Sequence, residues 1–386
     1  MDRLANNKTK QNKLLMIKIG ITGQEGFIGT HLYNFLALNK EVKLIDFSKS
    51  FFENQKLLQN FVKQCDVIVH LAAKNRHNDP LVIYDTNVLL VKQLIGAMEK
   101  EKVNPHILFS SSTQEEKDNP YGNSKKEGRK LLSKWAEKNE ATFTGLIIPN
   151  VFGPFGNPYY NSVIATFSYQ LTHNEIPKIN IDGNLKLIYI NELVEKIWNI
   201  IDKKISNPEY NIPFTNEIKV SEILKLLESY KQTYFNKNIF PSFQNQFEQN
   251  LFNTFRSYIE HKNYFPVHLK KNTDNRGSFV ETVKALTGGQ FSFSTSHPGI
   301  TRGNHFHTRK MERFAVISGK AKIELRKIGT KEVLKFDLDG ENPSFVDMPV
   351  WFTHNITNIG KEDLVTLFWI NEFFDPNDPD TYFENV

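Results

Sequence analysis

The 386-residue chain contains one cysteine, Cys65, and no basic block suited to nucleic acid. A single cysteine excludes a disulfide within the chain and is typical of a reducing compartment, so we expect a cytoplasmic protein. The formal net charge of +5 is small and spread along the chain, and we therefore expect no nucleic-acid partner. The sequence has no apolar run of about 18 residues, so we expect no membrane span.

The composition is that of a globular protein with more than one domain. Hydrophobic residues make up 39% of the chain and charged residues 24%, and 386 residues exceed the length of one typical domain. Residues 1–15 are polar and basic without an apolar core, so we exclude a secretion signal and interpret them as a disordered leader.

The first part of the chain alternates between strands and helices. Helical periodicity covers 28–38 and 87–100, and strands are expected at 16–22, 41–46, 66–73 and 107–112. The alternation predicts an α/β doubly wound parallel sheet of the Rossmann type. From about residue 150 the pattern loosens into helices and aromatic-rich connections, which we interpret as a substrate-facing part.

The chain changes character near residue 265. After Thr273 it consists of short strands separated by Gly, Pro and Asn turns, without intervening helices. Many short strands in succession predict an all-β barrel or sandwich. We therefore expect an α/β domain at 16–264 and a barrel domain at 265–386.

A glycine-rich turn, Gly-x-x-Gly-x-x-Gly, connects the first strand to the first helix. Such glycines let the backbone approach a pyrophosphate and let the helix pack on the strand, and the helix N-terminus then faces the phosphates. The turn predicts a dinucleotide site lined by Gly23, Gln24, Gly26, Phe27 and Ile28.

Two residues after the second strand bear on the choice of dinucleotide. Asp46 lies 23 residues after Gly23, where an acidic side chain binds the ribose of NAD(H). Lys49 could instead pair with the 2′-phosphate of NADP(H). These residues leave both dinucleotides open.

Tyr121 and Lys125 are four residues apart and so lie on one face of a predicted helix. A lysine cation beside a tyrosine lowers the pKa of the phenol from about 10 toward neutrality. The phenol can then give a proton to a carbonyl oxygen as hydride reaches the carbon. A second such pair, Tyr258 and Lys262, has no partner motif, and we interpret it as chance.

A serine at the end of the preceding strand completes the predicted catalytic set. The strand ends in three serines, and we choose Ser112 to hold the substrate oxygen, with Ser111 as the alternative. The predicted catalytic residues are therefore Ser112, Tyr121 and Lys125.

The sequence pattern includes, besides the glycine-rich turn and the catalytic set, Asn87 and the segments His70–Ala73 and Asn150–Pro154. With these residues, the first 260 positions resemble the extended short-chain dehydrogenases that act on nucleotide sugars. Ile147 departs from the pattern, since relatives often carry arginine before the Asn-x-x-Gly loop. The resemblance implies that the cofactor is also lined by Leu71, Ala72, Ala73, Tyr121 and Lys125.

The barrel domain carries three histidines and a glutamate spaced as metal ligands. His305 and His307 alternate along a strand and so point to one face, Glu312 begins the next strand, and His354 comes from a later one. Three imidazoles and a carboxylate form a divalent site with room for water or substrate. Zinc is our first choice of metal, with nickel, manganese and iron as alternatives.

The spacing of these ligands with Gly299, Gly319, Pro349 and Asn358 resembles that of the cupin barrels, and the resemblance implies a metal-binding cupin. Trp351 departs from it, because a glycine is usual two residues after that proline.

The segments Asp274–Glu281 and Arg302–His305 also resemble the deoxysugar 3,5-epimerases, which are cupin-fold enzymes. In those enzymes a histidine is the base and no metal is used, so His305 has two candidate roles, ligand or base. Arg276 and Arg302 are expected either to hold the substrate diphosphate or to brace the strand ends.

The pairing of the two domains, with a tail that runs Phe374-Asp-Pro-Asn-x-Pro-Asp-Thr-Tyr-Phe383, resembles the bifunctional capsular polysaccharide enzymes of the UDP-N-acetyl-L-fucosamine pathway. This resemblance implies C3 epimerisation of a UDP-2-acetamido-2,6-dideoxy-hexos-4-ulose in the cupin. It also implies NADPH-dependent reduction of the C4 ketone in the dehydrogenase domain. The chemistry agrees, because a C4 ketone acidifies the C3 proton and a metal can stabilise the enolate.

A UDP-sugar is therefore the expected substrate, and a homodimer is expected because barrels of this type commonly pair. The residues that we expect to contact the substrate are Arg76, Ser112, Asn150, Asn161, Arg276 and Arg302.

Two other functions remain open from the sequence. One is a nucleotide-sugar 4-epimerase or 4,6-dehydratase, although a dehydratase would need an acidic pair where Gln114 and Glu115 follow Thr113. In the other, the cupin is a non-catalytic binding or dimerisation module.

Overall fold

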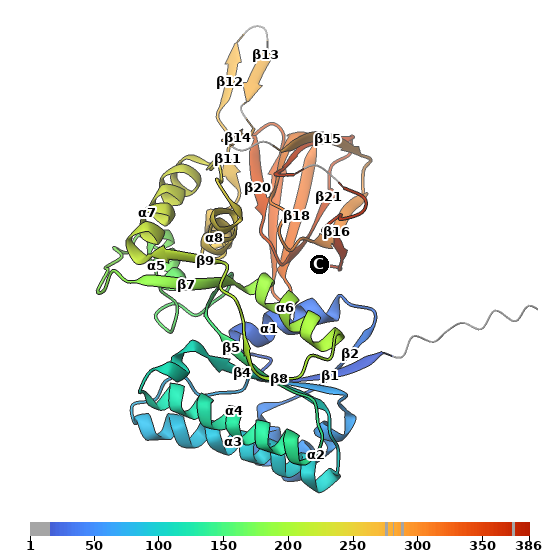
Figure 1. Cartoon of the computed structure of the whole chain (residues 1–386). Helices are drawn as coiled ribbons and strands as arrows, with labels where there is room; N and C mark the ends of the chain where they lie inside the picture. Colours follow the sequence, from blue (N-terminus) through green and yellow to red (C-terminus); the bar gives the residue numbers. More distant parts are fainter. Residues whose placement is uncertain (1–15, 275–276, 281, 287–288, 373–374) are drawn as a thin grey trace, which may run out of the picture. The chain divides into compact units, whose positions relative to one another are not determined.

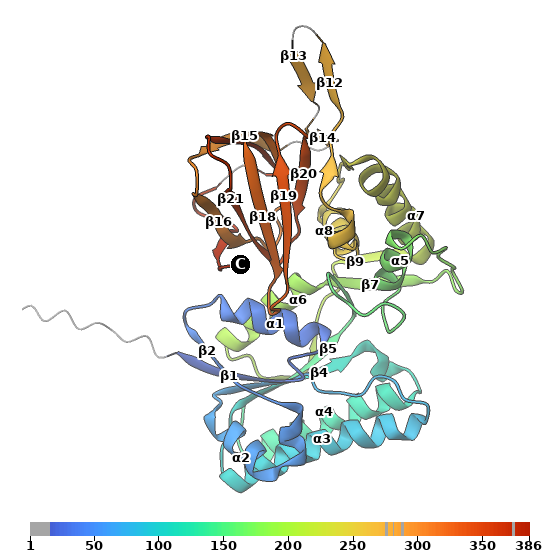
Figure 2. The ribbon, with the colours of Figure 1, turned by 180° about the vertical axis from the view of Figure 1, so that it is seen from behind.

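The computed structural model describes residues 16–386 except 275–276, 281, 287–288 and 373–374. The chain forms two compact units that interleave along the sequence (Figures 1 and 2). The first unit contains the chain up to Ile148 and the segment Val194–Ile212. The second contains Pro149–Leu193 and Pro213–Val386.

The first unit is built on a six-stranded parallel sheet in the order β2-β1-β3-β4-β5-β8. The central strand β3 is buried along its whole length, as expected for a strand with helices on both faces. The predicted doubly wound sheet is thereby confirmed. Its strands are β1 (Ile17–Thr22), β2 (Val42–Ile45), β3 (Val67–His70), β4 (His106–Ser112), β5 (Phe143–Ile148) and β8 (Asn207–Asn211).

Helices cover both faces of this sheet, with α2, α3 and α4 on one face and α1 and α6 on the other (Figure 1). The first of these faces is sealed by buried apolar side chains such as Leu94, Phe109 and Leu132. Short 3-10 helices, η1 (Lys49–Glu53) and η2 (Thr113–Glu116), follow β2 and β4. The α-helices are α1 (Phe27–Ala37), α2 (Gln55–Gln64), α3 (Pro80–Glu101), α4 (Pro120–Lys138) and α6 (Ile190–Asp202).

Helix α3 is, by length and composition alone, apolar enough to cross a membrane. It packs against α2 and α4, however, and its buried face includes the polar side chain of Asn87. The Asn87 amide donates to Lys74 O at 3.1 Å and to Ser124 Oγ at 3.0 Å. These contacts are those of a core helix in a globular unit.

The second unit combines a helical segment, residues 149–193 and 213–264, with a barrel, residues 265–386. In the helical segment, β6 (Asn150–Phe152), β7 (Asn184–Tyr189) and β9 (Asn216–Lys219) form a small sheet. A π-helical turn, η3 (Lys231–Phe235), follows α7. The helices are α5 (Val163–Thr172), α7 (Val220–Tyr230), α8 (Gln246–Arg256) and α9 (His261–Tyr264).

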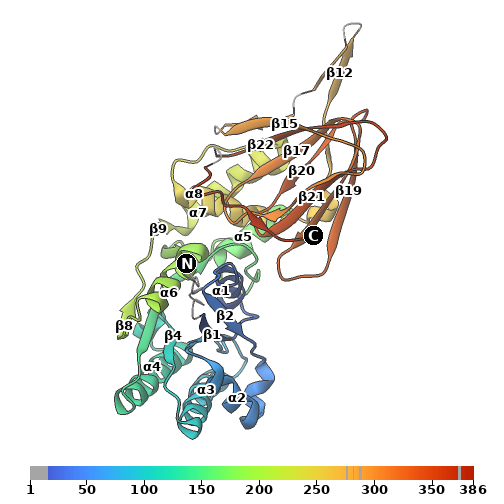
Figure 3. The same cartoon turned by 90° about the vertical axis from the view of Figure 1, so that its right-hand side faces the viewer.

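The barrel consists of two five-stranded sheets, β11-β20-β17-β22-β15 and β19-β18-β21-β16-β23 (Figure 3). Apolar side chains from both sheets, including Val316, Ile323 and Phe345, fill the space between them. The all-β prediction is confirmed. The strands are β11 (Val267–His268), β15 (Gln290–Ser296), β16 (Thr301–Phe306), β17 (Glu312–Ser318), β18 (Lys320–Lys327), β19 (Val333–Asp339), β20 (Ser344–Met348), β21 (Phe352–Asn358), β22 (Leu364–Ile370) and β23 (Tyr382–Phe383).

Two smaller strand pairs accompany the barrel. β12 (Lys271–Asp274) and β13 (Gly277–Val280) form an antiparallel hairpin. β10 (Ile239–Phe240), from the helical segment, pairs in parallel with β14 (Lys284–Ala285) of the barrel. The helical segment is therefore connected to the barrel by backbone hydrogen bonds as well as by side chains.

A buried ion pair also joins the barrel to the helical segment. The side chains of Arg313 on β17 and Asp347 on β20 are 1% and 0% exposed. Arg313 Nε donates to Asp347 Oδ1 at 2.7 Å, and Nη2 donates to Oδ2 at 3.0 Å. The Tyr234 hydroxyl donates to the same carboxylate, and Arg313 Nη1 donates to Asn238 O at 3.2 Å. One carboxylate thus holds two barrel strands and the helical segment together.

The boundaries of the two compact units differ from the expected domain boundary between residues 264 and 265. The change from helices to an all-β chain does fall near that limit. Residues 213–264 nevertheless group with the barrel, because aromatic side chains such as Phe240 pack on it, with 4.4 Å between the ring centroids of Phe240 and Trp369. The limits 16–264 and 265–386 therefore describe fold types, and their independence as domains stays a prediction.

Asp347→Asn is expected to lower the free energy of unfolding by about 3–5 kcal/mol, because it leaves Arg313 buried without its counter-charge. Thermal unfolding followed by near-UV circular dichroism measures this loss. The exposed pair of Lys138 and Glu99 provides the control, since Glu99→Gln is expected to change stability by less than about 0.5 kcal/mol. Equal melting curves for the two variants would contradict the role of the buried pair.

Candidate functional site

The glycine-rich turn between β1 and α1 has space only for glycine at two positions. Gly23 has a φ of +76°, and a Cβ there would lie 2.8 Å from Ala72 N. A Cβ at Gly29 would lie 2.1 Å from Gly23 O. The backbone is therefore packed closely at the carboxyl ends of β1 and β3, as the predicted dinucleotide turn requires.

Helix α1 begins at this turn without a side-chain cap, because its N-cap residue is Gly26. Its first N–H groups therefore have no side-chain acceptor at the cap, and such amides favour an anion. Gln24 Nε2 donates to Phe47 O at 2.7 Å, which ties the turn to the end of β2. Asp46 is exposed directly after β2, and Lys49 begins η1.

The segment after β3 lies against the glycine turn. Leu71 N donates to Thr22 O at 3.0 Å, and Ala72 N donates to Thr22 Oγ1 at 3.4 Å. His70 is buried, and desolvation, together with the charge of Lys125, lowers its pKa to about 3. The imidazole is therefore neutral, and its Nδ1 atom lies 2.6 Å from Thr22 Oγ1. The predicted cofactor residues of β1 and β3 are thus brought together.

Tyr121 and Lys125 lie on the first two turns of α4, on one face of the helix, as predicted. Lys125 Nζ is 5.8 Å from the centroid of the Tyr121 ring and 4.9 Å from that of Phe109. It donates to Ser110 Oγ at 3.3 Å. Burial lowers the pKa of Lys125 to about 7, and the nearby Glu115 carboxylate opposes this shift.

The serines at the end of β4 have different partners. The Ser110 hydroxyl donates to His70 O at 3.3 Å, and the Ser111 hydroxyl donates to the buried carboxylate of Glu115. Ser112 is half-buried at the end of β4, and its hydroxyl accepts from Gln114 N at 3.2 Å. Because Ser111 is committed to an internal carboxylate, the geometry favours Ser112 as the predicted substrate-facing hydroxyl.

Glu115 is committed to a buried ion pair. Its side chain is 7% exposed and forms a bidentate ion pair with Arg129, with Nη2 2.7 Å from Oε2 and Nε 2.9 Å from Oε1. Burial alone would raise the pKa of Glu115, but hydrogen bonds from Arg129 and Ser111 lower it. A carboxylate held ionised in this way cannot deliver a proton near neutral pH.

Tyr258 is a structural residue, in agreement with the interpretation of its Tyr-x-x-x-Lys pattern as chance. Its hydroxyl donates to Gly156 O at 2.7 Å, and its side chain is buried. Burial also raises the pKa of this phenol. The bond holds the loop after β6 against the end of α8.

The predicted substrate residues are distributed over both units. Arg76 is exposed in the first unit, whereas Asn150 and Asn161 are exposed in the second. Arg302 donates to Ser296 Oγ at 2.9 Å and to Thr295 O at 3.1 Å, so it braces β16 against β15. Arg276 lies outside the described residues. A role for any of them in substrate binding stays a prediction.

The four predicted metal ligands converge at one point of the barrel. Ligand atoms of His305, His307, Glu312 and His354 all lie within 4.8 Å of one another, and every one of the four except His305 is buried. His305 and His354 are direct partners across β16 and β21, His307 follows β16 by one residue, and Glu312 begins β17. The sequence therefore identified one contiguous cluster.

Hydrogen bonds on the outer side of two imidazoles direct Nε2 toward the centre of this cluster. His307 Nδ1 is 2.5 Å from Asp380 O, and His354 Nδ1 is 3.2 Å from Phe352 O. A carbonyl oxygen can only accept, so both Nδ1 atoms carry a hydrogen, and the Nε2 atom of each ring faces Glu312.

The inward-facing atoms lack the hydrogen bonds that burial normally demands. The Nε2 atoms of His307 and His354 lie 3.1 and 3.2 Å from Glu312 Oε2, yet none of these three atoms is in a good hydrogen-bond geometry. Desolvation and the neighbouring histidines lower the pKa of His305 to about 4, which keeps its imidazole neutral. Three imidazoles and a carboxylate that face one buried point fit a divalent cation.

Trp351 occupies the turn where cupins usually carry glycine. Its φ is +62°, in the left-handed region that favours glycine. Its backbone N–H donates to His307 O at 2.8 Å. Its ring stacks on Phe306 with 5.5 Å between centroids. The left-handed turn therefore accommodates tryptophan in place of glycine, because the indole packs against Phe306 at the end of β16.

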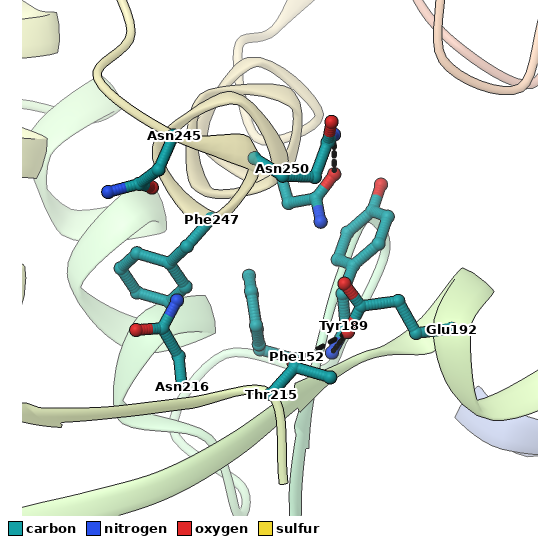
Figure 4. A pocket seen from close by; sticks show the side chains of 9 residues that line it. Phe152, Tyr189, Glu192, Thr215, Asn216, Asn245, Phe247 and Asn250 are labelled. Atoms are coloured by element: carbon teal, nitrogen blue, oxygen red, sulfur yellow. Dashed lines mark hydrogen bonds between the residues drawn. The ribbon is translucent and has the colours of Figure 1, made fainter.

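A cavity of about 190 Å³ that the sequence did not indicate lies between β7, β9 and α8 (Figure 4). The Tyr189 hydroxyl is buried without a hydrogen-bond partner among the described residues, and burial raises its pKa. No basic side chain lines the cavity, so it is suited to a neutral polar group rather than to phosphate. Its lining residues come from four separate stretches without a common spacing: Phe152, Tyr189, Glu192, Thr215, Asn216, Asn245, Gln246, Phe247 and Asn250.

Comparisons with known proteins agree with both halves of this chain. Residues 19–212 match the model of the NAD dependent epimerase/dehydratase family. The chain belongs to this family. Residues 272–382 match the polysaccharide biosynthesis C-terminal domain. The resemblance to extended short-chain dehydrogenases is thus confirmed.

Relatives cover both parts together. The UDP-2-acetamido-2,6-beta-L-arabino-hexul-4-ose reductase of Pseudomonas aeruginosa is 32% identical over 95% of this chain and 98% of its own. The crystal structure of the capsular polysaccharide assembling protein CapF from Staphylococcus aureus is 36% identical, with a TM-score of 0.61 over 96% of this chain and 100% of its own. RMD from Pseudomonas aeruginosa, 20% identical with a TM-score of 0.52 over 56% of this chain and 83% of its own, shares the fold of the dehydrogenase part.

Gly29→Ala is expected to weaken dinucleotide binding on the order of tenfold or more, or about 1.4 kcal/mol, because the new Cβ must displace the Gly23 carbonyl. Quenching of tryptophan fluorescence by NADPH or NADH measures the affinity. Gly96→Ala, in α3, is the matched control, because no atom beyond its chain neighbours and the backbone of its own helix lies within 4 Å of its Cβ position. That variant is expected to bind normally and to gain about 0.5–1 kcal/mol of stability. Normal binding by Gly29→Ala would refute the assignment of the turn.

Proposed function

We propose that this chain is a bifunctional nucleotide-sugar enzyme. Its cupin barrel epimerises C3 of a UDP-2-acetamido-2,6-dideoxy-hexos-4-ulose, and its dehydrogenase part reduces the C4 ketone with NADPH. The product serves the synthesis of UDP-N-acetyl-L-fucosamine for capsule or surface polysaccharide. The observation that supports the proposal is that one chain contains both predicted sites. This chain also matches the UDP-2-acetamido-2,6-beta-L-arabino-hexul-4-ose reductase of Pseudomonas aeruginosa almost end to end.

The first unit supplies the groups for reduction. When bound, NADPH delivers hydride to C4, and its pyrophosphate would lie at the glycine turn, with NADH as the alternative cofactor. The Tyr121 phenol gives its proton to the C4 oxygen, and the Ser112 hydroxyl holds that oxygen. The ammonium of Lys125 lies beside the Tyr121 ring and stabilises the phenolate that remains.

The barrel supplies the groups for epimerisation. His307, Glu312 and His354, with His305, would hold a divalent ion, zinc being the first choice, and the ion would polarise the C4 carbonyl so that the C3 proton becomes acidic. His305 is the least buried member of the cluster, which suits either a fourth ligand or the base that moves the C3 proton. One ketone therefore makes both reactions feasible, first inversion at C3 and then reduction at C4.

Quaternary structure and location complete the proposal. We expect a cytoplasmic homodimer, and the edge strand β15 supports pairing because it exposes Phe291 and Phe293, which are 57% and 70% accessible. Exposed aromatic side chains on an edge strand are typical of a surface that another strand covers. Light scattering at micromolar concentration gives the mass, and a monomer would contradict the dimer.

Tyr121→Phe is expected to reduce NADPH oxidation by about 10²- to 10⁴-fold while leaving cofactor affinity unchanged, because it removes only the proton donor. Steady-state kinetics with the ketosugar and a fluorescence titration of NADPH provide the two measurements. Tyr258→Phe is the matched control, since that hydroxyl only bonds Gly156 O. Turnover by Tyr121→Phe at the rate of Tyr258→Phe would overturn the catalytic assignment.

His307→Ala is expected to lose the metal and to stop deuterium uptake at C3, since the remaining ligands hold a divalent ion poorly. Metal content is measured by mass spectrometry, and exchange is measured by proton NMR of the UDP-sugar in D2O. His297→Ala, at an exposed histidine of the same barrel, should retain both properties.

Reduction of an already epimerised ketosugar should survive in His307→Ala, because Tyr121 and Lys125 lie in the other unit. Full exchange by the metal-free variant would exclude the Lewis-acid role and leave His305 as the first candidate for a metal-independent base. Loss of self-association alone would instead support a non-catalytic barrel.

A further inference from the structure

The end of the chain, residues 378–386, adds strand β23 to the sheet that carries the predicted metal ligands His305 and His354. Its strand β23 pairs antiparallel with β16, so that Phe383 lies opposite His305 and Tyr382 lies opposite Phe306. A second backbone bond, from Glu384 N to Asn304 O at 2.9 Å, continues the pairing. The two proposed reactions do not by themselves require this segment, which we call the C-terminal tail.

Asp380 of the tail is buried, 2% exposed, and its carboxylate accepts four hydrogen bonds from the residues that follow His307. Oδ1 accepts from Thr308 N at 3.0 Å and from Thr308 Oγ1 at 2.7 Å. Oδ2 accepts from Arg309 N and from Lys310 N, each at 3.0 Å. One side chain therefore holds three consecutive amides directly after a predicted metal ligand.

The backbone of the same residue acts on the ligand itself. Asp380 O is 2.5 Å from His307 Nδ1, which sets the tautomer and turns Nε2 toward Glu312. The φ of Asp380 is +37°, a left-handed conformation that Asp and Asn adopt more readily than most residues. The carbonyl and the carboxylate thus act together, one on the imidazole and one on the backbone that carries it.

The loop after His307 also binds the tail in return. Lys310 Nζ donates to Pro379 O at 2.6 Å, and Arg309 Nη2 is 2.9 Å from Asp378 Oδ2. Lys310 is 1% exposed, whereas the Asp378 side chain is 67% exposed. The tail is therefore fixed before Asp380 by these contacts and after Asp380 by the pairing of β23 with β16.

We propose that Asp380 is a positioning residue of the metal site, which orients His307 and so raises the affinity of the site for a divalent cation. The inference rests on the proposed metal site but not on the reaction assigned to it. A mutation of such an outer partner typically costs about 10- to 100-fold in metal affinity.

The test compares Asp380→Asn with wild type in the full-length protein. Asparagine keeps the backbone carbonyl and suits the left-handed φ, but its Nδ2 cannot accept from amides. Affinity for Zn²⁺, measured by competition with a chelator, is expected to fall about 10- to 100-fold. The visible spectrum of the Co²⁺-loaded protein is expected to change, because the His307 nitrogen is displaced.

Asp378→Asn is the matched control, because it changes an exposed aspartate two residues earlier in the same tail. It is expected to keep wild-type Zn²⁺ affinity and the wild-type Co²⁺ spectrum. If Asp380→Asn does not fold, Thr308→Val removes one of the four hydrogen bonds and is expected to show a smaller loss of affinity in the same direction.

Wild-type affinity and spectrum in the folded Asp380→Asn protein, or in Thr308→Val where the first is unfolded, would overturn the proposal. So would a lower melting temperature of the metal-free protein with an unchanged Co²⁺ spectrum, since that result describes a purely structural residue. A wild-type protein that binds no divalent ion overturns it as well. Failure of C3 exchange in a metal-loaded wild type refutes only the proposed epimerisation.

Discussion

The buried ion pair of Arg313 and Asp347 is the interaction on which the second unit depends. Removing two charges from water is costly, and only close hydrogen bonding of every charged atom offsets that cost. Arg313 and Asp347 are direct partners across β17 and β20. The residues next to them, Glu312 and Met348, form the adjacent pair of strand partners. The pair therefore sets the register of β17 on β20. A slip by one residue would turn Glu312 away from the histidines.

Around Glu312 the barrel brings together a buried carboxylate and three imidazoles. Burial alone would raise the pKa of this carboxyl, but the adjacent His307 and His354 lower it. The imidazoles are oriented from outside, by Asp380 O and Phe352 O, rather than by one another. The orientation of these two imidazoles is thus set by backbone carbonyls, one from the segment before β23 and one from β21.

The two units divide the chemical work between them. The first unit holds the glycine turn, Tyr121 and Lys125 on elements anchored in a parallel sheet, so their geometry is fixed by the sheet. The second unit holds the four predicted metal ligands together with Asn150 and Asn161 of the helical segment. That segment packs on the barrel through Tyr234 and Phe240, and the proposed substrate residues and the predicted metal ligands thus belong to one compact unit.

The sequence by itself determined the features that are written in local patterns. Alternating strands and helices indicated the parallel sheet, glycine spacing located the turn, and spacing along strands identified His305, His307, Glu312 and His354. Only the tertiary structure decided which residues are already committed: Ser111 and Arg129 to Glu115, Tyr258 to Gly156 O, and Asp380 to the loop after His307. It also grouped residues 213–264 with the barrel. The reason is physical, since periodicity and turn chemistry act over a few residues, whereas these bonds join groups that only the packed chain brings together.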